Sequence, residues 1–291
     1  MSRLAVHLRL IRVANAPTAA ADVLAGCLFA GGGVGLIGPL LLLCTASVCF
    51  YSGGMVLNDV CDAQRDAQGR PDRPIPAGQI SRRNAAIVAG LALAGGLALA
   101  VLAGPRPMRI ALGLVAAIIL YDVILKTTSL APAVMGLCRA LNLVLGVSLA
   151  GPLNQPMVIY AAVVYGLYVT AVTVFARRED QGGSGARLIG GGIGLVAAIV
   201  GLIGLLGVVD RPRSSCLLFA AATLVLITPS AWRAIGRRRP GDVQRAVGIM
   251  ILSLILFNAT LVCTTRGPAP AALVAALLIP AVAMRRWSRA S

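Results

Sequence analysis

Long apolar runs recur along the whole chain, and they constrain its fold more than any other feature. Ten runs have about the 20 residues that an α-helix needs to cross the hydrocarbon core of a bilayer. Short segments containing Arg, Gly and Pro separate them. Charged residues make up only 12% of the chain, against about 25% in a typical soluble domain. This pattern excludes a soluble enzyme and predicts an all-α fold, a polytopic transmembrane helical bundle.

The boundaries of the apolar runs define the expected spans. They are 17–37, 39–57, 84–103, 107–124, 131–150, 156–175, 187–208, 214–232, 245–264 and 268–284. The first two meet at Gly38-Pro39, where we expect a tight turn. The last is short and begins in a Pro/Ala-rich stretch. The prediction is therefore nine core spans plus a tenth, C-terminal span.

The basic residues indicate the orientation of the spans. With ten spans both termini lie on one side, and twenty of the 26 Lys and Arg residues fall on that side. Because short cytoplasmic connections are enriched in Lys and Arg, we expect both termini to be cytoplasmic. The net charge of +16 is spread between apolar runs, which favours membrane lipids as partners and argues against nucleic acid. The use of Arg in place of Lys, with many Ala, Gly, Leu and Val residues, suggests a bacterial inner membrane.

An amide and two carboxylates recur every four residues at the end of the second expected span. If the helix continues there, Asn58, Asp62 and Asp66 lie along one face. Asp59 then points about 100° away. Carboxylates on one face repel one another unless a cation lies between them. A set of oxygen ligands suits Mg²⁺, which uses few protein ligands and bridges substrate phosphates. A solvated loop with an ordinary mixture of charges is the alternative interpretation.

The same segment resembles the first aspartate-rich motif of the UbiA-type membrane prenyltransferases. That motif reads NDxxDxxxD followed by RPxRPIPxG, and this chain matches it from Asn58 to Gly78. The start of the first span and the segment from Tyr121 to Lys126 are also similar to that family. The resemblance implies a helical bundle of nine spans that binds a prenyl diphosphate through Mg²⁺ and two aspartate-rich motifs. It also implies transfer of the prenyl chain to an aromatic or other lipophilic acceptor, with loss of pyrophosphate.

The resemblance also implies roles for individual residues. Asn58 and Asp62 are expected to bind the metal, with Asp66 supporting the same cluster. Lys126 is expected to contact the diphosphate or to hold the connections that cover the cavity. The expected catalytic residues are Asp62, Asp66, Lys126 and Asp180. The expected substrate-binding residues are Arg12, Asn15, Arg73, Tyr121, Arg139, Asn142, Arg177 and Arg178.

The second aspartate-rich motif departs from the family pattern. The family usually reads DxxxD after its sixth span, whereas this chain has Ala176 in place of the first Asp and Arg178 in place of an interior acid. Glu179 and Asp180 remain as expected metal ligands, although adjacent residues do not share a helical face. Alternatively, Arg177 or Arg178 contacts the diphosphate directly as a fixed cation. An arginine pair that only orients the span is the third interpretation.

Two spans carry charged residues where burial is costly. Arg139 and Asn142 share a face of one span, and Gly136 one turn earlier allows close approach of another helix. Asp22 in the first span is a candidate partner for Arg139, either in a substrate cavity or as a structural bridge. This stretch and the altered second motif resemble the EboC-like branch of the family. Tyr51 stands where ubiquinone-type members have an arginine, which argues against 4-hydroxybenzoate as the acceptor.

The residues and the resemblance together favour one function over two alternatives. We expect residues 1–291 to form a single transmembrane domain, with loops 58–83 and 176–187 as a cap over the active-site cavity. The favoured function is Mg²⁺-dependent transfer of a prenyl group from prenyl diphosphate to a lipophilic or aromatic acceptor. The first alternative is a catalytically altered protein of the same fold that binds or moves a lipophilic metabolite. Secondary transport is disfavoured, because the acids cluster near one face and not at the bilayer midplane.

Overall fold

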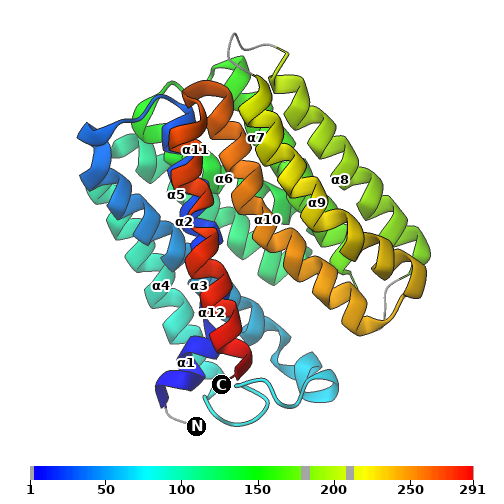
Figure 1. Ribbon diagram of the computed structural model, residues 1–291. Coiled ribbons are helices and arrows are strands. Elements are labelled where there is room, and N and C mark those ends of the chain that lie inside the picture. Colours follow the sequence, from blue (N-terminus) through cyan, green and yellow to red (C-terminus); the bar gives the residue numbers. More distant parts are fainter. Residues whose placement is uncertain (1–2, 178–183, 208–212, 291) are drawn as a thin grey trace.

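Helices form the regular secondary structure of this computed structural model, which describes residues 3–177, 184–207 and 213–290 (Figure 1). The α-helices are α1 (Arg3–Leu10), α2 (Ala16–Phe29), α3 (Ile37–Gly69), α4 (Arg82–Ala103), α5 (Pro105–Ile119), α6 (Ala131–Ala150), α7 (Pro156–Ala176), α8 (Gly185–Leu205), α9 (Arg213–Arg237), α10 (Pro240–Arg266), α11 (Pro268–Ala275) and α12 (Leu278–Ala290). The shorter elements are the 3₁₀ helices η1 (Val13–Asn15) and η2 (Val34–Leu36) and the π-helix η3 (Leu120–Leu125).

Nine helical segments among the described residues are long and apolar enough to cross a membrane. The prediction of an all-α, polytopic membrane fold is therefore confirmed. The expected spans 84–103, 131–150 and 156–175 coincide with α4, α6 and α7 to within two residues. The last of the nine segments, Pro268–Arg286, contains α11 and α12. The helix breaks between these two because Pro280 has no N–H to donate to the carbonyl group four residues earlier.

The first expected span and the turn after it differ from the prediction. α2 ends at Phe29, and the apolar helical stretch Val13–Phe29 is shorter than the other spans. Gly31 then adopts a φ of 97°, a left-handed conformation that glycine reaches without strain and that ends the helix. The tight turn expected at Gly38-Pro39 is wrong. Both residues lie in the first turn of α3, where proline is tolerated because its missing N–H has no partner in a helix.

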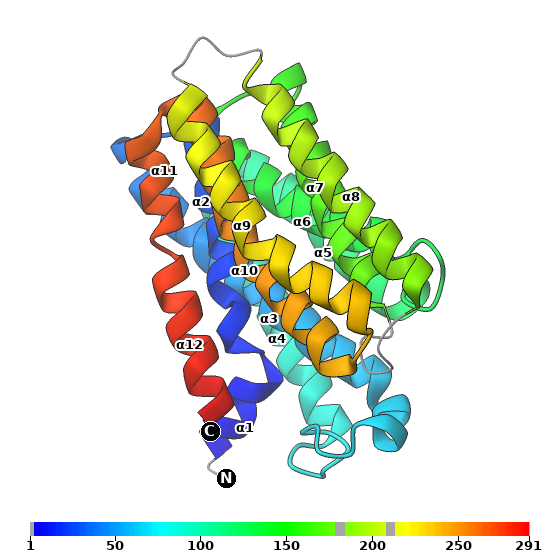
Figure 2. The ribbon, with the colours of Figure 1, turned by 45° about the vertical axis from the view of Figure 1, so that its right-hand side comes forward.

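Helices that follow one another in the sequence pack as neighbours, so the chain forms an up-and-down bundle (Figure 2). α2 and α10 occupy its centre. α2 packs against α3, α6 and α10, and α10 also packs against α7, α9 and α11. Both chain termini lie at one end of the bundle together with the α3–α4 connection, residues 70–81 (Figure 1). We call this end the termini face.

Glycines allow α6 to pack closely against the helices on both of its sides. A Cβ atom at Gly146 would overlap the carbonyl oxygen of Val23 in α2, and one at Gly26 would overlap that of Leu143 in α6. Gly136 plays the same part toward α7, where a Cβ would overlap Gly166. Small residues at such contacts let two backbones approach, which is the main source of helix association in lipid.

We expect the Gly146→Ala protein to be less stable than the native chain by about 1–3 kcal/mol, because the added methyl group forces α2 and α6 apart. Gly90→Ala in α4 is the matched control, since nothing lies within 4 Å of its added Cβ. That control should gain about 0.5–1 kcal/mol, because alanine loses less entropy than glycine in a helix. Thermal unfolding midpoints in detergent measure both, and equal midpoints would contradict the close α2–α6 contact.

Candidate active site

The C-terminal part of α3 carries the first acidic motif past the apolar part of the helix. No Gly or Pro lies between Gly54 and Gly69, so the helix continues unbroken to the termini face. The side chains of Asp59, Asp62 and Asp66 are all buried there. Because a buried carboxylate is costly unless it is paired, each of these three residues requires a partner.

Two arginines pair with the first and last of these carboxylates. Nη1 of Arg73 lies 2.9 Å from Oδ1 of Asp59 and 2.7 Å from Oδ2 of Asp66. Nη2 of Arg12 donates to the same oxygen of Asp59 at 2.9 Å. Asp59 and Asp66 are seven residues apart, or about two helical turns, so one guanidinium group reaches both. These ion pairs tie the α3–α4 connection and the N-terminal segment onto α3.

The middle carboxylate pairs with the π-helix that follows α5. Nζ of Lys126 hydrogen-bonds to Oδ2 of Asp62, and Nη2 of Arg65 lies 2.8 Å from that oxygen. Asn58 does not face the same partner: its Nδ2 donates to Oδ1 of Asp122 at 2.8 Å. The wider turns of η3 bring Asp122 and the C-terminal Lys126 toward α3. π-Helical turns of this kind are frequent at functional sites.

A basic cavity of about 880 Å³ opens beside these ion pairs at the termini face. Its cationic lining residues are Arg65, Arg70, Lys126, Arg177 and Arg187. Asp66 is the one carboxylate among the described residues that line it. An excess of positive charge in a recess of this size favours a ligand with several negative charges.

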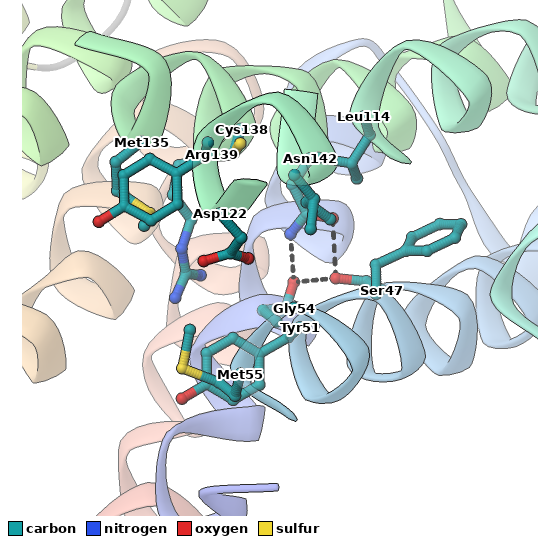
Figure 3. A pocket seen from close by; sticks show the side chains of 14 residues that line it. Ser47, Tyr51, Gly54, Met55, Leu114, Asp122, Met135, Cys138, Arg139 and Asn142 are labelled. Atoms are coloured by element: carbon teal, nitrogen blue, oxygen red, sulfur yellow. Dashed lines mark hydrogen bonds between the residues drawn. The ribbon is translucent and has the colours of Figure 1, made fainter. Parts of the chain in front are cut away.

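An apolar pocket of about 70 Å³ lies next to the basic cavity, and Tyr121 lines both. Phe50, Leu114 and Ile118 contribute much of its wall. Figure 3 shows Arg139 and Asp122 reaching into this pocket from α6 and η3.

Arg139 lies over the ring of Tyr51, with its Cζ atom 5.6 Å from the ring centroid. Because the ring belongs to α3 and the guanidinium group to α6, this contact joins the two helices beside the apolar pocket.

Asp22 is the centre of a polar network inside the bundle. It is fully buried, and Arg139 donates to its Oδ2 at 2.9 Å. The predicted Asp22–Arg139 pair is therefore confirmed. Asn142 donates to the same oxygen at 3.0 Å, while Asn258 donates to Oδ1 at 2.8 Å. The hydroxyl group of Tyr165 also donates to Oδ1. One carboxylate thus connects α2, α6, α7 and α10, and it balances the charge of the arginine beside the apolar pocket.

Comparison with known proteins agrees with this arrangement of helices and charges. The profile of the UbiA prenyltransferase family matches residues 19–254, which is most of the chain. The chain belongs to the UbiA prenyltransferase family. The family assignment confirms the predicted fold class and, as the class of activity, prenyl transfer. The EboC-like branch of the UbiA family stays a prediction.

Two curated relatives in the UbiA family carry the name digeranylgeranylglyceryl phosphate synthase. The protein from Methanopyrus kandleri is 31% identical over 274 residues, which cover 88% of this chain and 98% of that protein. The protein from Methanoculleus marisnigri is 40% identical over 121 residues. That second match covers 42% of this chain and 43% of the relative, so the chain matches less than half the length of that protein.

Two solved UbiA structures share the fold. The apo structure of a UbiA homolog from Aeropyrum pernix K1 has a TM-score of 0.70 at 16% identity, covering 84% of this chain and 96% of that one. A UbiA homolog from Archaeoglobus fulgidus, bound to DMAPP and Mg²⁺, has a TM-score of 0.54 at 16% identity, covering 88% and 98%. At this identity the likeness establishes the arrangement of helices.

The second UbiA motif is only partly visible. Arg178, Glu179 and Asp180 lie outside the described residues. Arg177 is described, and its Nη2 donates to the carbonyl oxygen of Thr128 at the edge of the basic cavity. This contact connects the end of α7 to the segment after η3. The predicted roles of these four positions stay predictions.

Among the predicted substrate-binding residues that the structure describes, Tyr121 and Arg177 line the basic cavity, and the others do not; these are Arg12, Asn15, Arg73, Arg139 and Asn142. Asn15 is in η1, and its backbone carbonyl group accepts a hydrogen bond from Thr18. Asn142 donates to Asp22 and accepts a hydrogen bond from Ser47 at 2.8 Å, so it lines the apolar pocket from within the polar network (Figure 3). Both side chains contact α3: that of Asn15 contacts Tyr51, and that of Asn142 contacts Ser47.

The oxygen ligands at the end of α3 fit Mg²⁺ by their chemistry. Among the described residues, no three His, Cys, Asp or Glu side chains converge tightly enough to enclose a metal ion by themselves. Mg²⁺ does not require such an enclosure, because it is usually held by one or two carboxylates together with substrate phosphates. Lys126 donates a hydrogen bond to Oδ2 of Asp62, and Arg65 forms an ion pair with that oxygen, while Arg73 donates to Oδ2 of Asp66.

Two residues of this site, Asp59 and Asp122, were not predicted from the sequence. Asp59 was placed apart from the other acids, but it shares Arg73 with Asp66. The signal was present in the sequence, because a separation of seven residues returns to nearly the same helix face. Asp122 accepts from Asn58, and no local pattern predicts that contact across 64 positions of the chain.

We expect the Arg73→Gln protein to lose the attachment of residues 70–81 to α3, because one side chain makes both contacts. Hydrogen–deuterium exchange of the backbone amides in residues 70–81 should become about tenfold faster, the change that loss of about 1.4 kcal/mol of local stability produces. Arg83→Gln, an exposed arginine at the start of α4, removes the same charge from the same region and is the control. Equal exchange rates in the two variants would contradict this role of Arg73.

Proposed function

We propose that this chain transfers a prenyl group from a prenyl diphosphate to a glycerophosphate-type lipid in the membrane, in an Mg²⁺-dependent reaction. The observation that carries the proposal is the junction of the basic cavity and the apolar pocket at Tyr121. A prenyl diphosphate has the same two parts, an anionic diphosphate and an apolar chain. The names of the two relatives support a glyceryl phosphate acceptor and a geranylgeranyl donor.

The diphosphate group binds in the basic cavity. Lys126 and Arg177 supply positive charge from two sides of it, and Arg73 holds the α3–α4 connection over α3. The residues that would hold Mg²⁺ are Asn58, Asp62, Asp66, Glu179 and Asp180. When bound there, Mg²⁺ supplies charge stabilisation for the departing pyrophosphate. The cations of the chain add to that stabilisation, because they are fixed in place before the reaction.

The apolar pocket accommodates the reacting end of the prenyl chain and keeps water away from it. Breaking the allylic carbon–oxygen bond leaves a carbocation that water would capture. Walls formed by Phe50, Leu114 and Ile118 exclude water from that carbon. Arg139 does not place an uncompensated charge beside the carbocation, because Asp22 neutralises it. The acceptor then attacks the carbon, and its proton is released.

The proposal places the termini face on the cytoplasmic side of a bacterial inner membrane. Arg65, Arg70, Arg177 and Arg187 line a cavity at that face, which agrees with the enrichment of basic residues on cytoplasmic surfaces. The soluble diphosphate would then reach the cavity from the cytoplasm. The end of α3 and the connection 70–81 lie at the same face. We propose that 58–83 and 176–187 together form the cap over the cavity, although residues 178–183 lie outside the described part of the chain.

The test is release of pyrophosphate by the purified, full-length protein in detergent. Geranylgeranyl diphosphate is the donor, and a mono-prenylated glyceryl phosphate is compared with 4-hydroxybenzoate as the acceptor. The proposal expects release that requires Mg²⁺ and increases with the glyceryl phosphate lipid. Tight binding of the donor without any release of pyrophosphate would contradict it, and would favour the alternative of a family member that binds or moves a lipophilic compound.

A further inference from the structure

A groove between α10 and α12 combines three arginines with an apolar floor, away from the basic cavity and the apolar pocket. Its volume is about 240 Å³. α10 and α12 contribute three side chains each, and these are Arg245, Ile249, Leu252, Val282, Arg285 and Arg286. Figure 2 shows that α10 begins and α12 ends toward the termini face. The residues that line the groove come from these parts of the two helices.

The polarity of the groove changes along the helix axes. α10 runs away from the termini face, so Arg245 is near that face and Leu252 lies about two turns deeper. α12 runs in the opposite direction, so Arg285 and Arg286 are near the face and Val282 lies about one turn deeper. Cations therefore occupy the outer end and aliphatic side chains the inner end. A membrane lipid has this same order, with its headgroup outside and its chains inside.

A contact with α10 fixes the position of the Arg285 side chain, which extends from α12. Its Nη1 donates to the backbone carbonyl oxygen of Gly248, and a Cβ atom at position 248 would overlap the guanidinium group. Only a glycine at this point lets the arginine cross to the neighbouring helix. The side chain is thus held at the edge of the groove by a specific contact, in addition to the general attraction of arginine to the membrane surface.

The charge of the groove requires an anion. Among the described residues that line it, none is Asp or Glu. Arg245 and Arg286 add positive charge to one recess from two helices, and an anionic group between them reduces their mutual repulsion. Arginine also forms paired hydrogen bonds with phosphate oxygens, which makes it the preferred residue for phosphate recognition.

We propose that this groove binds one anionic membrane lipid, with its phosphate among Arg245, Arg285 and Arg286 and an acyl or prenyl chain along Val282, Ile249 and Leu252. The volume of the groove is below the roughly 300–1,000 Å³ of a site that encloses a whole small molecule. That size suits a headgroup whose chains continue into the bilayer. Basic recesses between membrane helices on the cytoplasmic side are sites of this kind.

The experiment is native mass spectrometry of the full-length protein titrated in detergent with phosphatidylglycerol, phosphatidylcholine or inorganic phosphate. The test variant is Arg245→Gln with Arg286→Gln, both exposed side chains. The control is Arg233→Gln with Arg237→Gln, which removes the same charge from exposed positions of α9 outside the groove. Both variants keep Arg285 and the core of the bundle.

The proposal expects one phosphatidylglycerol molecule retained per chain, and affinity about 30-fold weaker in the groove variant but nearly unchanged in the control. Equal retention in the two variants would overturn the proposal, because surface charge alone would then explain binding. Equal retention of phosphatidylcholine would overturn the requirement for an anion. Displacement of the lipid by an equal concentration of inorganic phosphate would show a site for free phosphate and overturn the role of the apolar floor.

Discussion

The Asp62→Ala protein should release pyrophosphate at least about a hundredfold more slowly than the native chain at saturating donor. Asp62 lies in the middle of the acidic face of α3 and contacts Lys126, which also lines the basic cavity. Removing the carboxylate removes a proposed Mg²⁺ ligand and also the group that holds the lysine in place. Both losses act on the charge that develops on the leaving pyrophosphate, so the reaction step is affected more than donor binding.

The measurement is the rate of pyrophosphate release as a function of Mg²⁺ concentration, with thermal unfolding recorded beside it. Asp62→Asn keeps the size of the side chain and should lose most of the activity while it remains folded. Asp242→Asn, an acid in the first turn of α10, is the control and should retain the native rate. If the Asp62→Ala protein kept the native rate of Mg²⁺-dependent pyrophosphate release, the proposed metal site would be contradicted.

The Asp22→Leu protein should be destabilised by about 3–5 kcal/mol, the effect of removing one partner from a buried ion pair. The change leaves the guanidinium group of Arg139 buried without its carboxylate, and it removes the acceptor of Asn258 and Tyr165. Four helices meet at this carboxylate. Loss of the network therefore weakens the centre of the bundle, whereas a change at the surface would weaken only one contact.

A double-mutant cycle separates the ion pair from the rest of the network. Arg139→Met removes the charge while keeping a long side chain, and the Asp22→Leu/Arg139→Met protein has neither charge. The double variant should recover a large part of the stability that Asp22→Leu loses, because an apolar pair often replaces a buried ion pair at little cost. Unfolding midpoints in detergent give the coupling. Additive losses in the two single variants would show that Asp22 and Arg139 act independently.

The sequence predicted the parts of the fold that depend on local pattern. Apolar length predicted most of the spans. The expected span ended at residue 57 and 58–83 was expected as a loop, whereas α3 continues to Gly69. The pairing of Asp22 with Arg139 was also predictable, because two opposite charges in apolar spans have few other partners.

Features that depend on contacts between distant segments were not predictable in this way. The chain places Arg12 and Arg73 on one oxygen of Asp59, and those arginines come from opposite sides of α3 in the sequence. The turn expected at Gly38-Pro39 shows a different limit, since the same dipeptide is compatible with a turn and with the first turn of a helix. α2 ends at Phe29, before the positive-φ residue Gly31, so the chain has already turned before it reaches Gly38-Pro39.

The most direct test of the proposed reaction is mass spectrometry of the lipid product. The purified protein is incubated with geranylgeranyl diphosphate, Mg²⁺ and a mono-prenylated glyceryl phosphate. The account predicts a new lipid whose mass equals that of the acceptor plus one geranylgeranyl group less one hydrogen, formed in equal amount to pyrophosphate and absent when Mg²⁺ is chelated. A product that forms equally well without Mg²⁺, or no prenylated lipid under any of these conditions, would contradict it.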